Sequence, residues 1–325
     1  MLHGIHAIFP PPEITGHNGH NSIAYKKLVA GEGVWDTQKE ILGWDINGVD
    51  YTIQLPAKKC IDICALIKKC LKATKVPLGL FRKLAGKLQH ASFAIPSGKS
   101  LFTPVDMAMR DDPEWIVLDD ALQQCMVDWL FLVQCVSRKP TYLRQLVTKP
   151  PHFISYTNAC RLGAGGVWCA GTQALQPFLW QIEWPQEIQG ALITPDNPTG
   201  RLTINDLELA GALLGLLVLA DQDMDLRFSH LATFCDNMTT VVWAYRLRNS
   251  KFVAGFLLCF LGLFVHPLGG CSLVAHHLVG AKNLMADAIS QAFKRGQFYK
   301  AAKNPLPSFN NKFPLATKAL WQELD

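Results

Sequence analysis

Four segments in the second half of the chain each carry one polar side chain of a type that binds metal ions. The segments cover residues 154–158, 205–210, 233–237 and 283–288, and the side chains are those of Asn158, Glu208, Asp236 and Asp287. Carboxylate and amide oxygens are the ligands that hard cations such as Mg²⁺ and Mn²⁺ prefer. Carboxylates crowded together tolerate one another when cations neutralise them. If the fold gathers these four side chains, they are candidates for a metal site.

The chemistry that suits such a site is phosphodiester hydrolysis. When water attacks a phosphodiester in line, two ions about 4 Å apart stabilise both the entering and the leaving oxygen. Each acid taken alone has a simpler explanation, because a Glu or Asp near a helix start commonly complements the helix dipole at the surface. Asp206 is a poor substitute for a missing ligand, since it lies about 200° round the helix from Glu208. The order and placement of the set favour a site.

The elements that must position these side chains follow an α/β pattern. Strands are predicted at 152–158, 163–170 and 178–184, a helix from about Asp206, a strand at 231–235, helices at 237–248 and 251–265, a strand at 272–279 and a final helix from Asn283. Residues 185–203, rich in Pro and Gly, look like an insertion before the first helix. Three early strands followed by alternating helices and strands predict a mixed sheet with helices packed on its faces.

The first half of the chain predicts a hairpin followed by helices. Two strand-like runs, 41–46 and 49–55, flank Asn47-Gly48, a pair that suits a two-residue turn in which both residues take positive φ. After it, helices are predicted at 56–73, 80–93, 101–109 and 118–136, with a turn at 76–79. Residues 137–151 contain three prolines and predict a domain boundary.

The segment from residue 55 to residue 100 is strongly basic. It holds ten Lys and Arg residues and one acid, Asp62, in a chain whose formal net charge is +5. On the predicted helices the apolar residues face one way and the lysines the other. A phosphate backbone is the obvious partner, and a solvated lysine face is the alternative. The candidate nucleic-acid contacts are Lys58, Lys59, Lys68, Lys69, Lys72, Arg82, Lys83 and Lys87.

Composition limits the class of protein. The 325 residues, 49% of them hydrophobic, suffice for two globular domains. Ten scattered cysteines without a Cys-x-x-Cys pair indicate buried thiols in a reducing compartment, and the amino terminus lacks a secretory pattern, so we expect an intracellular protein of the cytoplasm or nucleus. The apolar stretches 207–220 and 252–265 fall short of the roughly 18 to 20 residues that cross a bilayer. No membrane partner is expected.

Several motifs together resemble a known family. They are the Leu42-Gly43-Trp44 hairpin, the helix at 84–91, the strand end Phe234-Cys235-Asp236-Asn237 and the tail at 277–290. Over residues 35–294 the chain resembles the thumb or connection region and the ribonuclease H-like domain of retrotransposon reverse transcriptases. The resemblance implies a ribonuclease H-like mixed sheet with flanking helices, preceded by a β-hairpin and a small helical thumb or connection region. No Tyr/Phe-x-Asp-Asp polymerase motif is present, so DNA synthesis by this chain alone is not expected.

The resemblance also implies a domain division. It places an irregular remnant at 1–34, the hairpin with the basic thumb or connection-like region at 35–148, the ribonuclease H-like domain at 149–296 and a tail at 297–325. A separate polymerase part of a retroelement is a conceivable partner.

The resemblance implies an activity and also a departure from it. In the family, carboxylates from the first strand, first helix, fourth strand and last helix bridge two divalent cations, Mg²⁺ or Mn²⁺, and the substrate is the RNA strand of an RNA–DNA hybrid. Glu208, Asp236 and Asp287 match that catalytic and metal-binding pattern, but Asn158 stands where Asp is expected. Because Asn158 brings no charge, we expect weak metal binding and slow or absent cleavage. The alternatives are an inactive nucleic-acid-binding relic and an unrelated interaction module.

Overall fold

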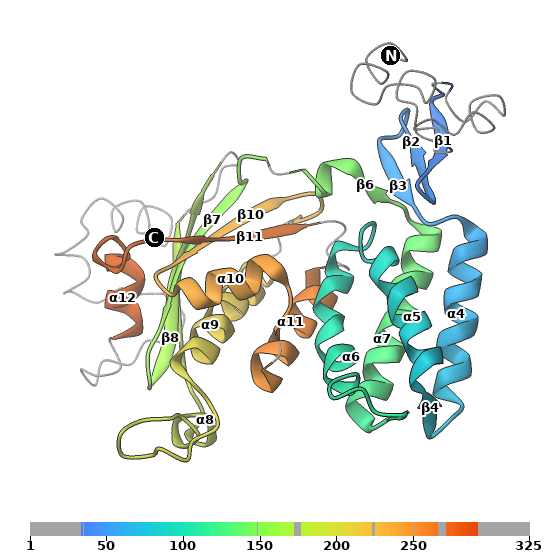
Figure 1. Ribbon diagram of the computed structural model, residues 1–325. Coiled ribbons are helices and arrows are strands. Elements are labelled where there is room, and N and C mark those ends of the chain that lie inside the picture. Colours follow the sequence, from blue (N-terminus) through green and yellow to red (C-terminus); the bar gives the residue numbers. More distant parts are fainter. Residues whose placement is uncertain are drawn as a thin grey trace, which may run out of the picture.

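The computed structural model describes residues 34, 36–147, 149–171, 177–222, 225–249, 251–265 and 271–291. The predicted remnant at 1–34, except residue 34, and the predicted tail at 297–325 lie outside these residues. Two large hydrophobic cores are built mainly from residues before 137 and after 152, with Cys259 of the second half packed in the first core. Figure 1 shows them side by side, with a small sheet projecting above the first.

The projecting sheet has four antiparallel strands in the order β1-β2-β3-β6, which are β1 (Gln38–Ile41), β2 (Trp44–Asn47), β3 (Thr52–Gln54) and β6 (Thr141–Tyr142). The predicted hairpin is present as β2 and β3, but its predicted turn is wrong. The backbone N–H groups of Val49 and Asp50 donate to Asn47 Oδ1 at 2.9 and 3.0 Å, which holds a wider loop. The two-residue turn with positive φ at both positions is Leu42-Gly43, between β1 and β2.

A helical layer lies below this sheet. Its helices are α4 (Ala57–Leu71), α5 (Leu78–Ala91), η1 (Pro96–Leu101), α6 (Phe102–Ala108) and α7 (Asp120–Arg138). Fully buried side chains such as Leu84, Leu88 and Trp129 fill the core between them. The predicted turn at 76–79 is wrong, because β4 (Lys75–Pro77) pairs with β5 (Trp115–Val117) and α5 begins directly after Pro77. That pairing joins residues far apart in sequence, so no local pattern reveals it.

The second core is built on a five-stranded sheet of β7 (Phe153–Ala159), β8 (Gly163–Ala170), β9 (Phe178–Glu183), β10 (His230–Cys235) and β11 (Ser272–His277). The strand order is β11-β10-β7-β8-β9. β7, β8 and β9 are antiparallel neighbours, whereas β10 runs parallel to both β7 and β11. The predicted mixed sheet is confirmed.

Helices cover both faces of this sheet (Figure 1). On one face lie α9 (Ile204–Ala220) and α10 (Met238–Arg246), with α11 (Phe252–Val265) packed against these two helices, and on the other α12 (Leu284–Ser290) contacts β8 and β7. Short elements η2 (Leu143–Gln145), α8 (Gln186–Gly190) and η3 (Gly280–Lys282) complete the described fold, with α8 inside the predicted insertion. At Gly211 of α9 a Cβ would lie 3.2 Å from Ala164 Cβ, so glycine allows the helix to approach β8 closely.

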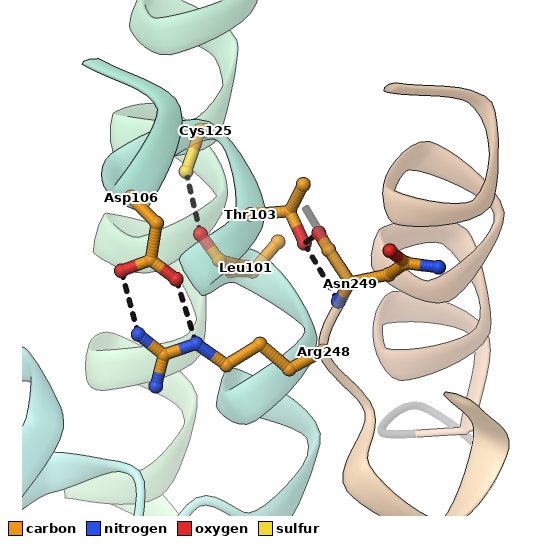
Figure 2. A network of polar contacts seen from close by, with 6 residues as sticks. All are labelled: Leu101, Thr103, Asp106, Cys125, Arg248 and Asn249. Atoms are coloured by element: carbon orange, nitrogen blue, oxygen red, sulfur yellow. Dashed lines mark hydrogen bonds and ion pairs between the residues drawn. The ribbon is translucent and has the colours of Figure 1, made fainter. Parts of the chain in front are cut away.

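The two cores are joined through α6 and α11. The Arg248 guanidinium donates to both carboxylate oxygens of Asp106 at 2.6 Å each, and Thr103 Oγ1 donates to the Asn249 carbonyl at 2.7 Å (Figure 2). Cys259 of α11 belongs to the first core, where its Sγ donates to the Ser100 carbonyl. A bidentate ion pair and shared apolar packing therefore hold the two parts in one arrangement.

Gly255 of α11 tests how tightly this junction is packed. A Cβ there would lie 2.2 Å from Thr103 Cγ2. We expect Gly255→Ala to lower the free energy of unfolding by about 1–3 kcal/mol, as overpacking does. The matched control is Gly86→Ala in α5, where nothing lies within 4 Å, and alanine should raise stability by about 0.5–1 kcal/mol. Urea denaturation of the native protein and the two variants measures both changes in the free energy of unfolding. If Gly255→Ala stabilises the protein as Gly86→Ala does, the junction is not tightly packed.

The cysteines agree with the thiol prediction. All ten are free, seven buried and three half-buried. Burial raises the pKa of Cys235, Cys259 and Cys271 to about 12, which keeps these thiols protonated and inert. Within the part of the chain that the structure describes, no helix combines the length and the apolar character that crossing a bilayer requires.

Candidate active site

The four predicted site residues come together at one end of the five-stranded sheet, where β7 and β10 terminate. Asn158 is the penultimate residue of β7, and Asp236 directly follows β10, which runs parallel beside β7. Glu208 lies in the second turn of α9, and Asp287 lies in α12. These are the first strand, the first long helix, the fourth strand and the last helix of the second part, in the order that the resemblance implies.

Contacts and charges show how closely they meet. Asn158 Nδ2 donates to Asp287 Oδ1 at 3.0 Å, and the backbone N–H of Ala159 donates to the Glu208 carboxylate. The charges of Asp236 and Asp287 both act on Glu208. Glu208 thus lies within electrostatic reach of Asp236 and Asp287, and Asn158 contacts Asp287, although the four residues are distant in sequence.

Glu208 is the most perturbed of them. It is 4% exposed, and its Oε2 has no hydrogen-bond partner among the described residues. Burial raises its pKa to about 8, the hydrogen bond from Ala159 opposes this, and the charges of Asp236 and Asp287 add to it. In the absence of a cation, Glu208 is therefore mostly protonated at neutral pH.

Asn158 acts as a hydrogen-bond donor in this site. Besides Asp287, its Nδ2 reaches Ser290 Oγ at 3.0 Å, and Ser290 Oγ donates in turn to the Asp287 carbonyl at 3.1 Å. Gln291 Nε2 also donates to Asp287 Oδ1. Asp287 Oδ1 thus accepts hydrogen bonds from two side-chain amide groups. A carboxylate at position 158 could not donate, so this arrangement depends on the amide.

Asp206 does not stand in for the missing carboxylate. Its Oδ2 accepts hydrogen bonds from the backbone N–H and the hydroxyl of Thr203, at 2.8 and 2.6 Å. This is a capping box at the start of α9, which satisfies the free N–H groups of the first turn. Asp206 therefore fixes the start of the helix that carries Glu208.

Three asparagines that the sequence reasoning passed over hold the site elements together. Asn237 caps α10 by accepting from the Thr240 backbone N–H at 3.1 Å, and its Nδ2 donates to Asn205 Oδ1 at 2.7 Å, which ties β10 to α9. Asn283 Nδ2 donates to the Thr157 carbonyl at 3.0 Å and ties α12 to β7. A signal was available, because all three lie inside the four segments that carry the acids.

The donor set departs from what two bridging cations need. Three carboxylates offer oxygens, but the amide at position 158 is turned toward Asp287 as a donor. In the described part of the chain, no three His, Cys, Asp or Glu side chains gather closely enough to hold a metal ion. The residues as they stand do not fit the two-ion arrangement, because Glu208, Asp236 and Asp287 are not gathered closely enough and position 158 presents an amide donor.

The predicted nucleic-acid contacts fall into two groups. Lys59 donates to the Gly43 carbonyl at 2.7 Å and lies 3.7 Å from Glu40, and Arg82 and Lys87 form ion pairs with Asp112 and Asp62. The second group is exposed and forms no ion pair with any described residue: Lys58, Lys68, Lys69, Lys72 and Lys83. The four of these on α4 and at its carboxyl end, all but Lys83, lie within an arc of about 100° at 100° per residue. They form one stripe, called the α4 lysine stripe below.

The α4 lysine stripe and the candidate active site lie far apart. Figure 1 shows α4 and α12 at opposite ends of the molecule, with the two cores between them. A ligand that touched both would have to extend along the protein, as a nucleic-acid duplex can.

No family model and no curated protein matches the chain. Among solved structures, it is similar to ribonuclease H1 from the halophilic archaeon Halobacterium salinarum, with 16% identity over 44% of this chain and 98% of that chain and a TM-score of 0.31. LC11 ribonuclease H1, isolated from compost, has 17% identity over 45% and 98%, with a TM-score of 0.32.

A foamy viral protease-reverse transcriptase in complex with RNA/DNA hybrid has 9% identity over 74% of this chain and a TM-score of 0.30. The present chain covers only 29% of that viral chain. At these TM-scores the likenesses carry no argument about activity. The fold itself is a five-stranded mixed α/β sheet with helices on both faces.

Proposed function

We propose that the protein binds RNA–DNA hybrids through its ribonuclease H-like domain and its basic helices, and that Asn158 impairs hydrolysis of the RNA strand. One observation carries the proposal. Asn158, Glu208, Asp236 and Asp287 converge at the carboxyl ends of two parallel strands. A buried acid such as Glu208, whose pKa is raised by burial and by neighbouring acids, costs stability, and such costs are typical of functional sites.

The α4 lysine stripe supports a nucleic-acid partner. Each exposed lysine that neutralises a phosphate releases a counterion, and this gives affinity without sequence preference. A hybrid duplex has an A-like form whose deep groove is closed to side chains, so recognition rests on phosphates and 2′-hydroxyls. Contacts of this kind fit lysines on an outer helix face.

If the site is active, Glu208, Asp236 and Asp287 are the residues that would hold Mg²⁺ or Mn²⁺. Such ions supply stabilisation of charge on the phosphodiester oxygens. In this chain Glu208 is buried, Asp236 directly follows β10 and Asp287 lies in α12, and these placements would position the three ligands. We expect native cleavage to be slow or absent because Asn158 contributes neither a charge nor an oxygen turned toward the other acids.

A second candidate function is binding without cleavage, as in an inactive relic of a reverse transcriptase that lacks the polymerase site. The hydrogen bonds from Asn158 to Asp287 and Ser290 favour it, since they stabilise the site without a metal. A retroelement origin and a separate polymerase part as partner belong to this proposal as well.

The deciding experiment measures binding and cleavage of a labelled RNA–DNA hybrid in Mg²⁺ and in Mn²⁺, with Asp236→Asn as the control. Cleavage that Asp236→Asn abolishes would establish an enzyme despite Asn158. Salt-sensitive binding without cleavage by either protein would establish the second function. Absence of both binding and cleavage from a folded protein would refute both and leave an interaction module built on the same fold.

The α4 lysine stripe gives a separate prediction about binding. Replacing Lys58, Lys69 and Lys72 by Gln should reduce the slope of log K against log salt by about 0.7–0.9 for each phosphate that a lysine no longer neutralises. Lys139→Gln is the control, because Lys139 is exposed but lies outside the stripe. Fluorescence anisotropy with a labelled hybrid at several salt concentrations provides the slopes. Equal slopes for the triple variant and the native protein would show that these lysines contact no phosphate and are only solvated.

A further inference from the structure

The sheet face turned away from α9, α10 and α11 carries a row of aromatic rings. Tyr156 of β7, Phe234 of β10 and His276 of β11 are register partners on three neighbouring strands. Alternate residues of a strand point to the same side. Asn158 lies on this side with Tyr156, because it bonds α12, whereas Ala159 faces α9. The three rings therefore lie on the sheet face that also carries Asn158.

These rings form a ladder across the sheet. The ring centroids of Tyr156 and Phe234 are 5.4 Å apart with planes 23° from parallel, and those of Phe234 and His276 are 5.1 Å apart at 24°. Such separations between nearly parallel rings describe offset stacks. The ladder ends on His276 in β11, which is the edge strand of this sheet. His276 is exposed and stacks on no second ring of a described residue.

The part of the sheet under the ladder is left open by the described helices. α12 contacts β8, β7 and β9 and makes no comparable contact with β10 or β11. None of the three rings belongs to either hydrophobic core, and Tyr156 and Phe234 are half-buried. In Figure 1 the long helices α9, α10 and α11 lie together on one side of the sheet. A flat ligand thus has access to the ladder at its β11 end.

Basic side chains gather near the opposite end of the same face. His230 of β10 and Ser272 of β11 are register partners there, joined by a hydrogen bond of 2.7 Å, and His152 lies beside them. Nearby, the Arg144 guanidinium carbon lies 3.9 Å from the ring centroid of Phe228.

The charges around His230 are all of one sign. Burial lowers the pKa of His230, and so do His152, Lys149 and Arg144, which favours the neutral form of His230, so the positive charge here belongs to the exposed Arg144 and Lys149. This cluster is called the cationic end below. An uncompensated positive cluster of this kind is complementary to phosphate.

We infer that this face binds a single-stranded segment of nucleic acid, with an unpaired base stacked on His276 at the end of the ladder and phosphates at the cationic end. Base stacking on aromatic rings and basic groups that follow the backbone are the two elements of single-strand binding surfaces. Four residues of strand separate His230 from Phe234, about 13 Å at 3.3 Å per residue, which a strand of a few nucleotides spans. A protein partner would explain the rings but not the cationic end.

The ladder also leads toward the candidate active site. Asn158 and Asp236 follow Tyr156 and Phe234 by two residues, about 7 Å along the strands. These side chains lie on the far side of the ladder from the cationic end, so a bound single strand would reach them by extending past the ladder. The inference goes beyond hybrid binding, because it assigns a second surface that uses none of the α4 lysines.

His276 and His277 provide the test with a matched control. They are adjacent exposed histidines of the same strand, but alternation turns only His276 toward the ladder. Binding of fluorescein-labelled oligouridylate to the full chain is measured by anisotropy. We expect His276→Ala to weaken binding about 5-fold or more, His277→Ala to leave it unchanged, and Phe234→Leu, which keeps an apolar side chain, to weaken it too. Arg144→Gln should lower the salt slope by about 0.7.

The outcomes separate this inference from hybrid binding. If the His276 and His277 variants bind oligouridylate equally well, or if the native chain does not bind it, the inference is overturned. In the second case, self-association that His276→Ala abolishes would identify a second copy as the occupant. Loss of single-strand binding in His276→Ala with hybrid binding intact supports the second surface. If the protein binds oligouridylate in a His276-dependent way but does not bind the hybrid, the proposed function is refuted and the inference is supported.

Discussion

Replacing Asn158 by Asp is expected to raise metal-dependent cleavage of an RNA–DNA hybrid by at least about 100-fold over the native chain, since even residues that only orient metal ligands typically change activity 10- to 100-fold. The physical reason lies in the contact between Asn158 and Asp287. An oxygen in place of Asn158 Nδ2 would lie 3.0 Å from Asp287 Oδ1. Two carboxylate oxygens at that distance repel unless a cation lies between them.

The same repulsion gives a readout that does not depend on activity. In chelator, Asn158→Asp should melt below the native protein, and Mg²⁺ should raise its melting temperature while leaving that of the native protein nearly unchanged. Asn158→Ala is the control, because it removes the hydrogen bonds to Asp287 and Ser290 without adding charge. It should lose stability equally with and without Mg²⁺.

Cleavage needs its own control, which is Asp236→Asn combined with Asn158→Asp. If this double variant is inactive where Asn158→Asp cuts, the cleavage belongs to the site. An Asn158→Asp protein that gains neither cleavage nor metal-dependent melting would show that these four positions do not form a cation site even with four carboxylates. Hybrid binding by such a protein would then support the nucleic-acid-binding function.

The convergence of the four candidate residues could be predicted from sequence because they lie in short segments with distinct local patterns. Asp236 follows a buried strand and Glu208 lies near a helix start, so each element positions its own acid. The mixed sheet with flanking helices needed only the alternation of strands and helices, whereas the strand order was not predicted.

What could not be predicted are the contacts between segments. The partners of Asn158 lie 129 and 132 residues away, and the Cys259 hydrogen bond joins α11 to a residue 159 positions earlier. Sequence therefore identified Asn158 as a missing charge but gave no sign of its donor role. It likewise placed α11 in the second domain without indicating that it packs on the first.

Local reasoning also failed where two local rules competed. Asn47-Gly48 satisfies the rule for a two-residue turn, yet Asn47 uses its side chain to hold a wider loop. Leu42-Gly43 takes the tight turn although Leu42 is a poor residue for positive φ. The antiparallel register between β1 and β2 overrides that local cost.

Because the pKa of Glu208 is raised, we expect the free energy of unfolding of the metal-free protein to fall as pH rises from 4.5 toward 8. Its pKa is about 8 in the folded protein, against an ordinary value of 4.5. Below pH 4.5 the carboxyl is protonated in both the folded and the unfolded chain, and its full contribution to the free energy of unfolding is present. Between the two values the unfolded chain releases a proton that the folded chain keeps, so rising pH favours unfolding. Above pH 8 the contribution is lost.

The size of this effect and its origin in one side chain are open to measurement. At 1.36 kcal/mol per pKa unit, the difference between 4.5 and about 8 corresponds to at most about 5 kcal/mol. Glu208→Gln should remove this slope from urea denaturation in chelator, because the amide does not titrate. Glu183→Gln, at the exposed end of β9, should retain it. If Glu208→Gln keeps the native slope, Glu208 is ionised in the folded protein, and the crowding of Glu208, Asp236 and Asp287 that supports a cation site is absent.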